Sequence, residues 1–86
     1  MYLHIGKDRI LKKENILFIL DYENLKDNKQ FKNFFSKIPE KNKIDISNQN
    51  PKTILIIQEK GIIKAYISNI SSTTLGKREE YKYFKR

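Results

Sequence analysis

The sequence predicts a single α+β domain in which a small, twisted, mostly antiparallel sheet is combined with one amphipathic helix and a C-terminal helix. Two β-branched runs, at residues 53–58 and 62–68, are joined through Glu59-Lys60-Gly61 and predict a β-hairpin, because glycine supplies the left-handed residue of a tight connection. Apolar residues between positions 31 and 38 recur at helical spacing. With 86 residues, the chain has room for one hydrophobic core.

Short extended runs outside the hairpin predict the other strands. Residues 2–5 alternate in polarity and stop at Gly6-Lys7-Asp8, which predicts a strand followed by a turn. Extended structure resumes at residues 10–11. Residues 16–20 form a β-branched and aromatic run that is too short for a helix, and we expect a buried central strand there. A further short strand is predicted at residues 44–46.

The amphipathic helix is expected at about residues 28–38, after a polar loop at residues 21–28. Asp27 is the predicted N-cap, and Gln30 follows three residues later to complete a capping box. Pro39 ends the helix, because proline disfavours helical geometry in the residue before it. The predicted apolar face consists of Phe31, Phe34, Phe35 and Ile38.

The last part of the domain is expected to contain the second hairpin strand and a short helix. Side chains of this strand are predicted to alternate, with Ile63, Ala65 and Ile67 on one face and Lys64 and Tyr66 on the other. Ser71 or Ser72 can cap a helix that begins near Thr73, with Leu75 pointing inward. We expect the domain to span residues 1–78 and a basic, aromatic extension, a fraying helix end, to occupy residues 79–86.

Composition limits the compartment and the chemistry of the protein. The absence of cysteine excludes disulfides and thiolate metal sites. The longest apolar run, residues 16–20, is far below the roughly 18 residues that span a bilayer, and the N-terminus does not resemble a signal peptide. We therefore expect a cytoplasmic protein that does not contact membranes. Hydrophobic residues are 38% of the chain, so the core is thin and self-association is favoured.

An enzymatic function is not expected. His4 is the only histidine, and no nucleophile-elbow sequence surrounds any serine. Adjacent carboxylates such as Glu79 and Glu80 would point about 100 degrees apart on a helix. The glycines are too scattered to cradle a phosphate, at Gly6, Gly61 and Gly76. We therefore expect no catalytic residues, cofactor, metal or small-molecule substrate.

The balance of charge favours a polyanionic partner. Lysine and arginine number 18 against 10 acids, which gives a net charge of +8. The basic residues form three clusters: Lys7, Arg9, Lys12 and Lys13; Lys29, Lys32, Lys37, Lys41 and Lys43; and Lys77, Arg78, Lys82, Lys85 and Arg86. A competing interpretation is a solvated face in a lysine-rich protein. Tyr66, Tyr81 and Tyr83 could also stack the bases of single-stranded RNA.

Three groups of short segments, in their order and spacing, resemble the RemA/RemB family of small bacterial regulators of biofilm-matrix genes. They are Tyr2-Leu3-His4-Ile5-Gly6; Ile44-Asp45-Ile46 followed by Pro51-Lys52-Thr53; and Tyr66-Ile67-Ser68 with Ser71-Ser72-Thr73-Thr74-Leu75. The resemblance spans about residues 1–78. It implies a cytoplasmic DNA-binding transcriptional regulator that assembles into a ring and wraps DNA on a basic rim.

The resemblance also implies positions for the DNA contacts. The family places arginines just before the first strand of its last hairpin, where this chain has Asn50-Pro51-Lys52, and in the turn before its second long strand, where this chain has Lys13-Glu14-Asn15. Neither arginine is present, so Lys13 and Lys52 are the substitutes by proximity. We expect these two lysines to lie at the ends of neighbouring strands and to share one cationic face.

The sequence therefore predicts a non-enzymatic regulator that binds double-stranded DNA as a homo-oligomer, either a dimer or a ring. The predicted nucleic-acid-binding residues are Lys13, Lys52, Lys12, Arg9, Lys77 and Arg78. Lysines contact phosphates without reading sequence, so affinity is expected to exceed specificity. Two alternatives stay open: a protein-interaction module that acts on another regulator without touching nucleic acid, and a single-stranded RNA-binding protein.

Overall fold

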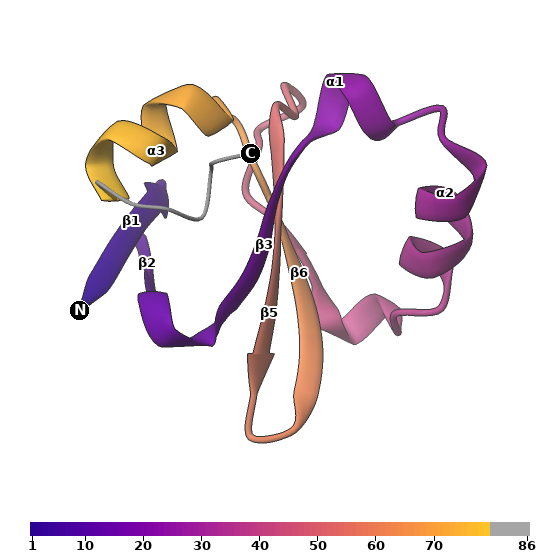
Figure 1. Cartoon of the computed structure of the whole chain (residues 1–86), viewed down its shortest axis with the longest axis horizontal. Helices are drawn as coiled ribbons and strands as arrows, with labels where there is room; N and C mark the ends of the chain where they lie inside the picture. The colour runs from indigo at the N-terminus through magenta and orange to yellow at the C-terminus, as the bar shows by residue number, and fades with distance from the viewer. Residues whose placement is uncertain (80–86) are drawn as a thin grey trace.

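A four-stranded sheet lies in the middle of the molecule in the computed structural model, which describes the backbone of residues 1–79 and the side chains of residues 1–77 (Figure 1). In spatial order its strands are β3 (Ile16–Asp21), β5 (Thr53–Glu59), β6 (Ile62–Ser68) and β4 (Lys43–Asp45). β4 runs parallel to β6, and the other neighbouring strands are antiparallel. The predicted α+β class with a mostly antiparallel sheet is confirmed.

Separate elements cover the two faces of this sheet. One face carries a two-stranded hairpin, β1 (Tyr2–Gly6) and β2 (Arg9–Lys12), together with the C-terminal helix α3 (Ser72–Glu79) (Figure 1). The opposite face carries the short helix α1 (Tyr22–Leu25) and the helix α2 (Lys29–Ser36). The chain therefore forms three layers, with β5 and β6 in the middle one.

β5 is the buried centre of the fold, because residues 53–57 are all buried. Leu55 and Ile57 face the β1–β2 hairpin, where they join a cluster that includes Leu3 and Leu75. The alternate side chains face α2 and form a second cluster, with Ile54, Ile56, Ile38 and Ala65. A strand buried on both faces reads as a continuous apolar run, which is the pattern of Ile54–Ile57.

The prediction of a buried central strand at residues 16–20 is wrong. β3 forms an edge of the sheet, and Leu17 and Phe18 are 42% and 57% exposed. An apolar run of this kind occurs both in central strands and in edge strands that have an uncovered surface. Composition alone therefore does not show which position the strand takes. The register shifts between Ile16 and Phe18, which marks a bulge near Leu17.

Residues 21–28 are not a loop throughout, because α1 lies within them. The Asp21 carboxylate accepts a hydrogen bond from the Glu23 N–H at 3.0 Å and caps this short helix. The N-cap of α2 is Asn28 rather than Asp27: its side-chain oxygen accepts from the Phe31 N–H at 2.8 Å. Both residue types cap helices well, so the sequence favours neither of two adjacent candidates.

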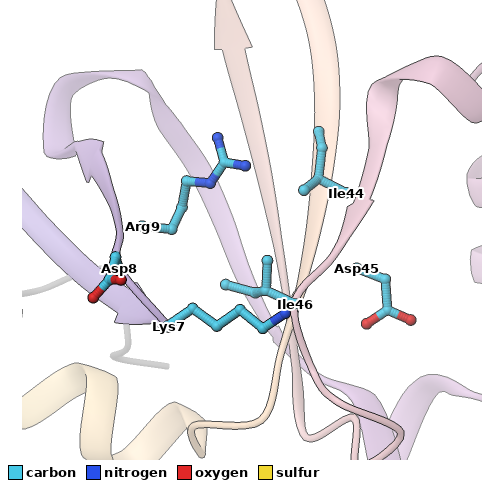
Figure 2. A pocket seen from close by; sticks show the side chains of 6 residues that line it. All are labelled: Lys7, Asp8, Arg9, Ile44, Asp45 and Ile46. Carbon is cyan, nitrogen blue, oxygen red and sulfur yellow. The ribbon is translucent and has the colours of Figure 1, made fainter.

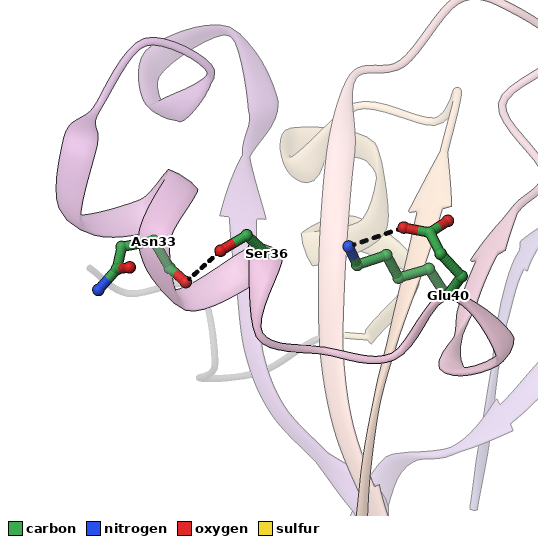
Figure 3. Close-up of polar contacts among 4 residues, drawn as sticks. Asn33, Ser36 and Glu40 are labelled. Carbon is green, nitrogen blue, oxygen red and sulfur yellow. Dashed lines mark hydrogen bonds and ion pairs between the residues drawn. The ribbon is translucent and has the colours of Figure 1, made fainter.

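α2 is shorter than predicted and ends at Ser36, whose hydroxyl donates to the carbonyl oxygen of Asn33 at 2.8 Å (Figure 3). Beyond it, Ile38 is still buried against the sheet. A 3₁₀ turn at Glu40–Asn42 leads into β4. Lys43 binds Glu40 at 3.2 Å (Figure 3) and places its ammonium 4.5 Å from the centroid of the Phe35 ring, which joins α2 to the start of β4.

The predicted β5–β6 hairpin is confirmed, with a two-residue connection. Lys60 and Gly61 both have positive φ, at 53° and 80°. Two consecutive left-handed residues make a type I′ turn, whose twist matches that of the strands. The predicted alternation along β6 is also confirmed: Ala65, Ile63 and Ile67 pack in the α2 cluster, and Tyr66 packs in the opposite one.

The prediction for α3 is also confirmed. The Ser71 hydroxyl accepts a hydrogen bond from the Thr74 N–H at 3.1 Å and caps the helix. Leu75 is fully buried against β1. Of the predicted extension 79–86, only the backbone of Glu79 lies within the described residues. No helix in the described part of the chain is long and apolar enough to cross a membrane.

A buried hydroxyl fastens the β1–β2 hairpin to the sheet. Ser68, at the end of β6, donates to the carbonyl oxygen of Ile5 at 2.6 Å and accepts from the Ile70 N–H at 3.0 Å. Gly6 lies directly above, and a Cβ there would meet the Ser68 hydroxyl at 3.6 Å. This side chain therefore joins the two sheets directly, in addition to the apolar packing between them.

Ser68→Ala is expected to lower the free energy of unfolding by about 1–3 kcal/mol, because it leaves the buried Ile5 carbonyl without its donor. Urea denaturation followed by circular dichroism measures the change. Ser36→Ala is the matched control, since it removes a serine-to-carbonyl bond of similar length from an exposed position. Equal unfolding midpoints for the two variants would show that Ser68 does not fasten the hairpin.

Candidate nucleic-acid interface

Basic residues gather on the β1–β2 hairpin, beginning at its turn. Gly6 and Lys7 have positive φ, at 126° and 49°, and this sharp reversal projects Lys7 into solvent. His4 donates from Nε2 to the Lys7 carbonyl oxygen at 2.7 Å, which stabilises the turn. The histidine therefore has a structural contact, and Lys7 is presented on an ordered loop.

Arg9 follows the turn and lies between the hairpin and the sheet. The central guanidinium carbon is 5.5 Å from the centroid of the Tyr66 ring, a cation–π distance. Tyr66 is only 6% exposed and packs in the core, so its ring is a fixed support. Arg9 itself remains exposed. Its guanidinium is therefore held in place while its outer donors face solvent.

Two open hollows lie on either side of Arg9. The first, of about 580 Å³, separates the hairpin turn from the end of β4 and is lined by Lys7, Asp8, Arg9, Ile44, Asp45 and Ile46 (Figure 2). In Figure 2 the Lys7 side chain reaches across it toward Ile46. The second hollow, of about 370 Å³, lies between β2 and the β5–β6 hairpin, and its lining includes Lys12 and Lys64.

We call Lys7, Arg9, Lys12 and the two hollows the basic cleft. Its three cations form no ion pair with a carboxylate of any described residue. Two nearby acids are occupied, because Glu59 binds Lys64 at 3.4 Å and Glu14 binds the N-terminal ammonium at 3.6 Å. Asp8 and Asp45 line the first hollow beside Lys7 and Arg9. The two hollows together are lined by four cations, Lys7, Arg9, Lys12 and Lys64, and by three carboxylates, Asp8, Asp45 and Glu59, so the cleft carries a small excess of positive charge that an anionic ligand can neutralise.

Asp45 stands at one edge of the cleft with its carboxylate engaged. The Ser47 hydroxyl and N–H donate to Oδ1 at 2.6 and 2.9 Å. These two hydrogen bonds, with a smaller contribution from the charge of Lys7, lower the pKa of Asp45 below its ordinary value. Asp45 therefore stays ionised and partly offsets Lys7, which leaves Arg9 and Lys12 as the more strongly positive end.

The expected shared cationic face of Lys13 and Lys52 is not formed. β3 and β5 are antiparallel, with Ile16 opposite Ile57 and Asp21 opposite Thr53, so Lys13 and Lys52 lie beyond opposite ends of this pair. Five residue steps along β3 separate those ends by about 17 Å. Lys13, in a 3₁₀ turn at Lys13–Asn15, is only 9% exposed, whereas Lys52 is exposed.

The other predicted site residues have separate positions. Lys12 and Arg9 lie in the cleft. Lys77 is exposed on α3, and the Arg78 side chain, like Tyr81 and Tyr83, lies outside the described residues. Tyr66 cannot stack bases as the RNA hypothesis required, because it is buried beneath Arg9.

Two residues of the cleft were missing from the predicted site, Lys7 and Lys64. Lys7 belongs to the first basic cluster, and its place in a glycine turn indicates exposure. Lys64 shares a strand face with Tyr66, so the alternation of β6 places it near any residue that contacts this ring. Neither the turn position of Lys7 nor the alternation of β6 shows by itself that the β1–β2 hairpin folds back over β6.

No group of three or more potential metal-ligating side chains is present in the part of the chain that the structure describes. No family model matches the sequence, and a search of curated proteins finds no relative. The basic cleft is therefore interpreted from its own geometry and charge.

Asp45→Ala is expected to lower the free energy of unfolding by about 1 kcal/mol at neutral pH, because the variant cannot accept the two hydrogen bonds from Ser47. The folded-state pKa is depressed, so this stabilisation is present above the unfolded value and disappears as the pH falls through the folded one. The difference between wild type and variant should thus shrink below pH 3.8, the ordinary value.

Urea denaturation across a pH series tests this expectation. Asp8→Ala is the control, because it removes the same charge from an exposed turn residue whose carboxylate accepts no hydrogen bond from a described residue. An Asp45→Ala penalty that does not change with pH, or that matches Asp8→Ala, would contradict the role given to Ser47.

Proposed function

We propose that this protein is a non-enzymatic, DNA-binding transcriptional regulator of the RemA type that contacts the phosphates of duplex DNA through the basic cleft. One observation carries the proposal: Lys7, Arg9 and Lys12 line two hollows that share Arg9, and they form no ion pair with described residues. Unneutralised cations grouped around hollows of a small, strongly basic protein are the electrostatic pattern of a nucleic-acid binder. The family resemblance supports gene regulation as the purpose of the contact.

Duplex DNA fits the cleft better than single-stranded RNA. Binding of single strands uses several exposed aromatic rings on which successive bases stack. Around the cleft, Tyr2 is the exposed ring, whereas Tyr66 is buried. A group of cations without a series of exposed aromatic rings is suited to phosphate contacts, and one arginine among lysines favours charge over base reading.

Multiple copies would strengthen this contact. Three cations neutralise only a few phosphates, and contacts of this kind are weak individually and fall with salt. Linking identical clefts in one assembly makes the second contact intramolecular, which raises overall affinity without any new interaction. We therefore propose that DNA is bound by a homo-oligomer, as the thin core also favours.

A second candidate, a protein-interaction module without nucleic-acid contact, is favoured by a different observation. Phe34 is 44% exposed and lines two hollows on the α2 side of the sheet. This surface lies opposite the basic cleft, so the two functions predict damage from different substitutions.

Lys7→Glu/Lys12→Glu is expected to weaken binding to duplex DNA at least tenfold, because two attractive phosphate interactions become repulsive. The slope of log K against log salt should fall by about 1.8, at about 0.9 for each phosphate that the variant no longer neutralises. Fluorescence anisotropy with a labelled duplex across a salt series measures both quantities, and circular dichroism checks folding.

Lys29→Glu/Lys32→Glu is the matched control, because it makes the same charge change at exposed positions on α2. This control should lose less affinity and keep the wild-type slope. Equal losses of affinity would mean that net charge, rather than the cleft, attracts DNA. Binding that does not change with salt would favour the interaction module, and tighter binding to single-stranded RNA of equal length would favour the RNA hypothesis.

A further inference from the structure

An apolar surface lies between β3 and α2, on the side of the sheet away from the basic cleft. Its central hollow, of about 330 Å³, is lined by Phe18, Leu20, Leu25, Gln30, Phe31, Phe34 and Ile56. No charged side chain lines it. Phe18 and Phe34 are 57% and 44% exposed at its rim. We call it the β3–α2 groove.

The groove is open because α2 is too short to cover it. The helix has only eight residues, and none of them is buried, although its apolar and polar faces are well separated. Phe31 and Phe35 stack at 5.5 Å between ring centroids and pack on the sheet. Phe34 instead projects between the groove and a second hollow next to Ile38 and Ile63. The apolar stripe of α2 is therefore only partly packed against the sheet.

The backbone of β3 borders the same groove. β3 pairs with β5 on one side, and no other described strand lies on its outer edge. Natural edge strands are usually blocked by charged side chains, prolines or bulges. Ile16–Leu20 contains no charge and no proline, and the bulge near Leu17 lies before the regular stretch Phe18–Asp21. That stretch is open to pairing with another strand.

We propose that a second copy of this chain occupies the groove, with the two β3 strands paired antiparallel about a two-fold axis at Ile19. Opposite residues in an antiparallel pair share one face of the sheet, and Phe18 and Leu20 both face α2. Pairing centred on Ile19 places Phe18 of each copy opposite the partner's Leu20. The surface is thus complementary to itself, as a two-fold interface requires.

The size and charge of the surface favour a second copy over other occupants. A polyanion finds no cation lining this groove. The end of the described chain, α3, lies on the opposite face of the sheet (Figure 1). Half-exposed Phe18 and Phe34 each offer about 100 Å² of apolar area, or about 400 Å² over two copies, and the paired strands add main-chain hydrogen bonds, which together suit a weak dimer.

This dimer extends the proposed function. Its contribution to DNA binding rests on that function. A two-fold axis perpendicular to the sheet keeps both α2 helices on one face of a continuous eight-stranded sheet and both basic clefts on the other. The cations of both clefts then lie on the same face of the dimer and can contact one duplex. Self-association does not depend on DNA binding, so each can fail separately.

Sedimentation equilibrium without DNA tests the interface. Wild type is expected to dimerise at tens of micromolar, and Phe18→Lys should weaken the dimer at least tenfold while remaining folded, because residue 18 is largely exposed. Ile62→Lys is the control, with the same charge change at a 49% exposed residue at the hairpin end. A wild-type monomer at all concentrations up to about 1 mM, or equal effects of both variants, would overturn the proposal.

A cysteine variant tests the register. The chain has no cysteine, so Ile19→Cys introduces a single thiol that meets its own copy at the two-fold axis. Mild oxidation should give a disulfide-linked dimer for Ile19→Cys and much less for Ile62→Cys. Equal cross-linking of the two, or none with Ile19→Cys, would overturn the pairing. If Phe18→Lys is monomeric but binds DNA as tightly as wild type, the dimer stands and its contribution to DNA binding is excluded.

Discussion

The fold depends on the burial of β5 on both faces. Five consecutive residues of this strand are buried, so the chain must supply one apolar layer above the sheet and another below it. With 86 residues, neither layer can be large. The β1–β2 hairpin and α3 form one layer, and α1 with α2 forms the other. The two layers cover β5 to different extents. The basic cleft and the β3–α2 groove both result from this difference.

The hairpin layer is closed at its centre and open at its rim. Buried Ser68 bonds Ile5, and Leu3 and Leu75 pack on β5, so the hairpin is held firmly over the sheet. Polar side chains at its rim then surround open hollows, with Arg9 supported on Tyr66. The α2 layer is open at its centre because eight residues cannot cover both β3 and β5. The hollows lined by Lys7, Arg9 and Lys12 therefore lie on one side of the molecule, and the uncovered apolar area lies on the other.

Local patterns in the sequence predicted the β5–β6 hairpin, the apolar stripe of α2 and the inward direction of Leu75, because strand and helix periodicity depend only on neighbouring residues. The order of strands in the sheet could not be predicted in this way. An apolar run such as Ile16–Leu20 is equally suited to a central strand and to an edge that another chain covers. Similarly, the burial of Lys13 depends on the return of the N-terminus, since its N–H donates to the Met1 carbonyl oxygen at 3.0 Å.

The candidate site shows the same division between local and long-range information. Arg9 and Lys12 could be predicted because both belong to the first basic cluster of the sequence, and they form the two ends of β2. The sequence could not show which lysines are neutralised, since Lys43 and Lys64 meet their glutamates only in the folded chain. It also could not show that Tyr66 supports Arg9, a contact between residues 57 positions apart that requires the hairpin to fold over β6. The basic cleft is thus a product of the hairpin layer, and it exists only while the burial of β5 holds that layer in place.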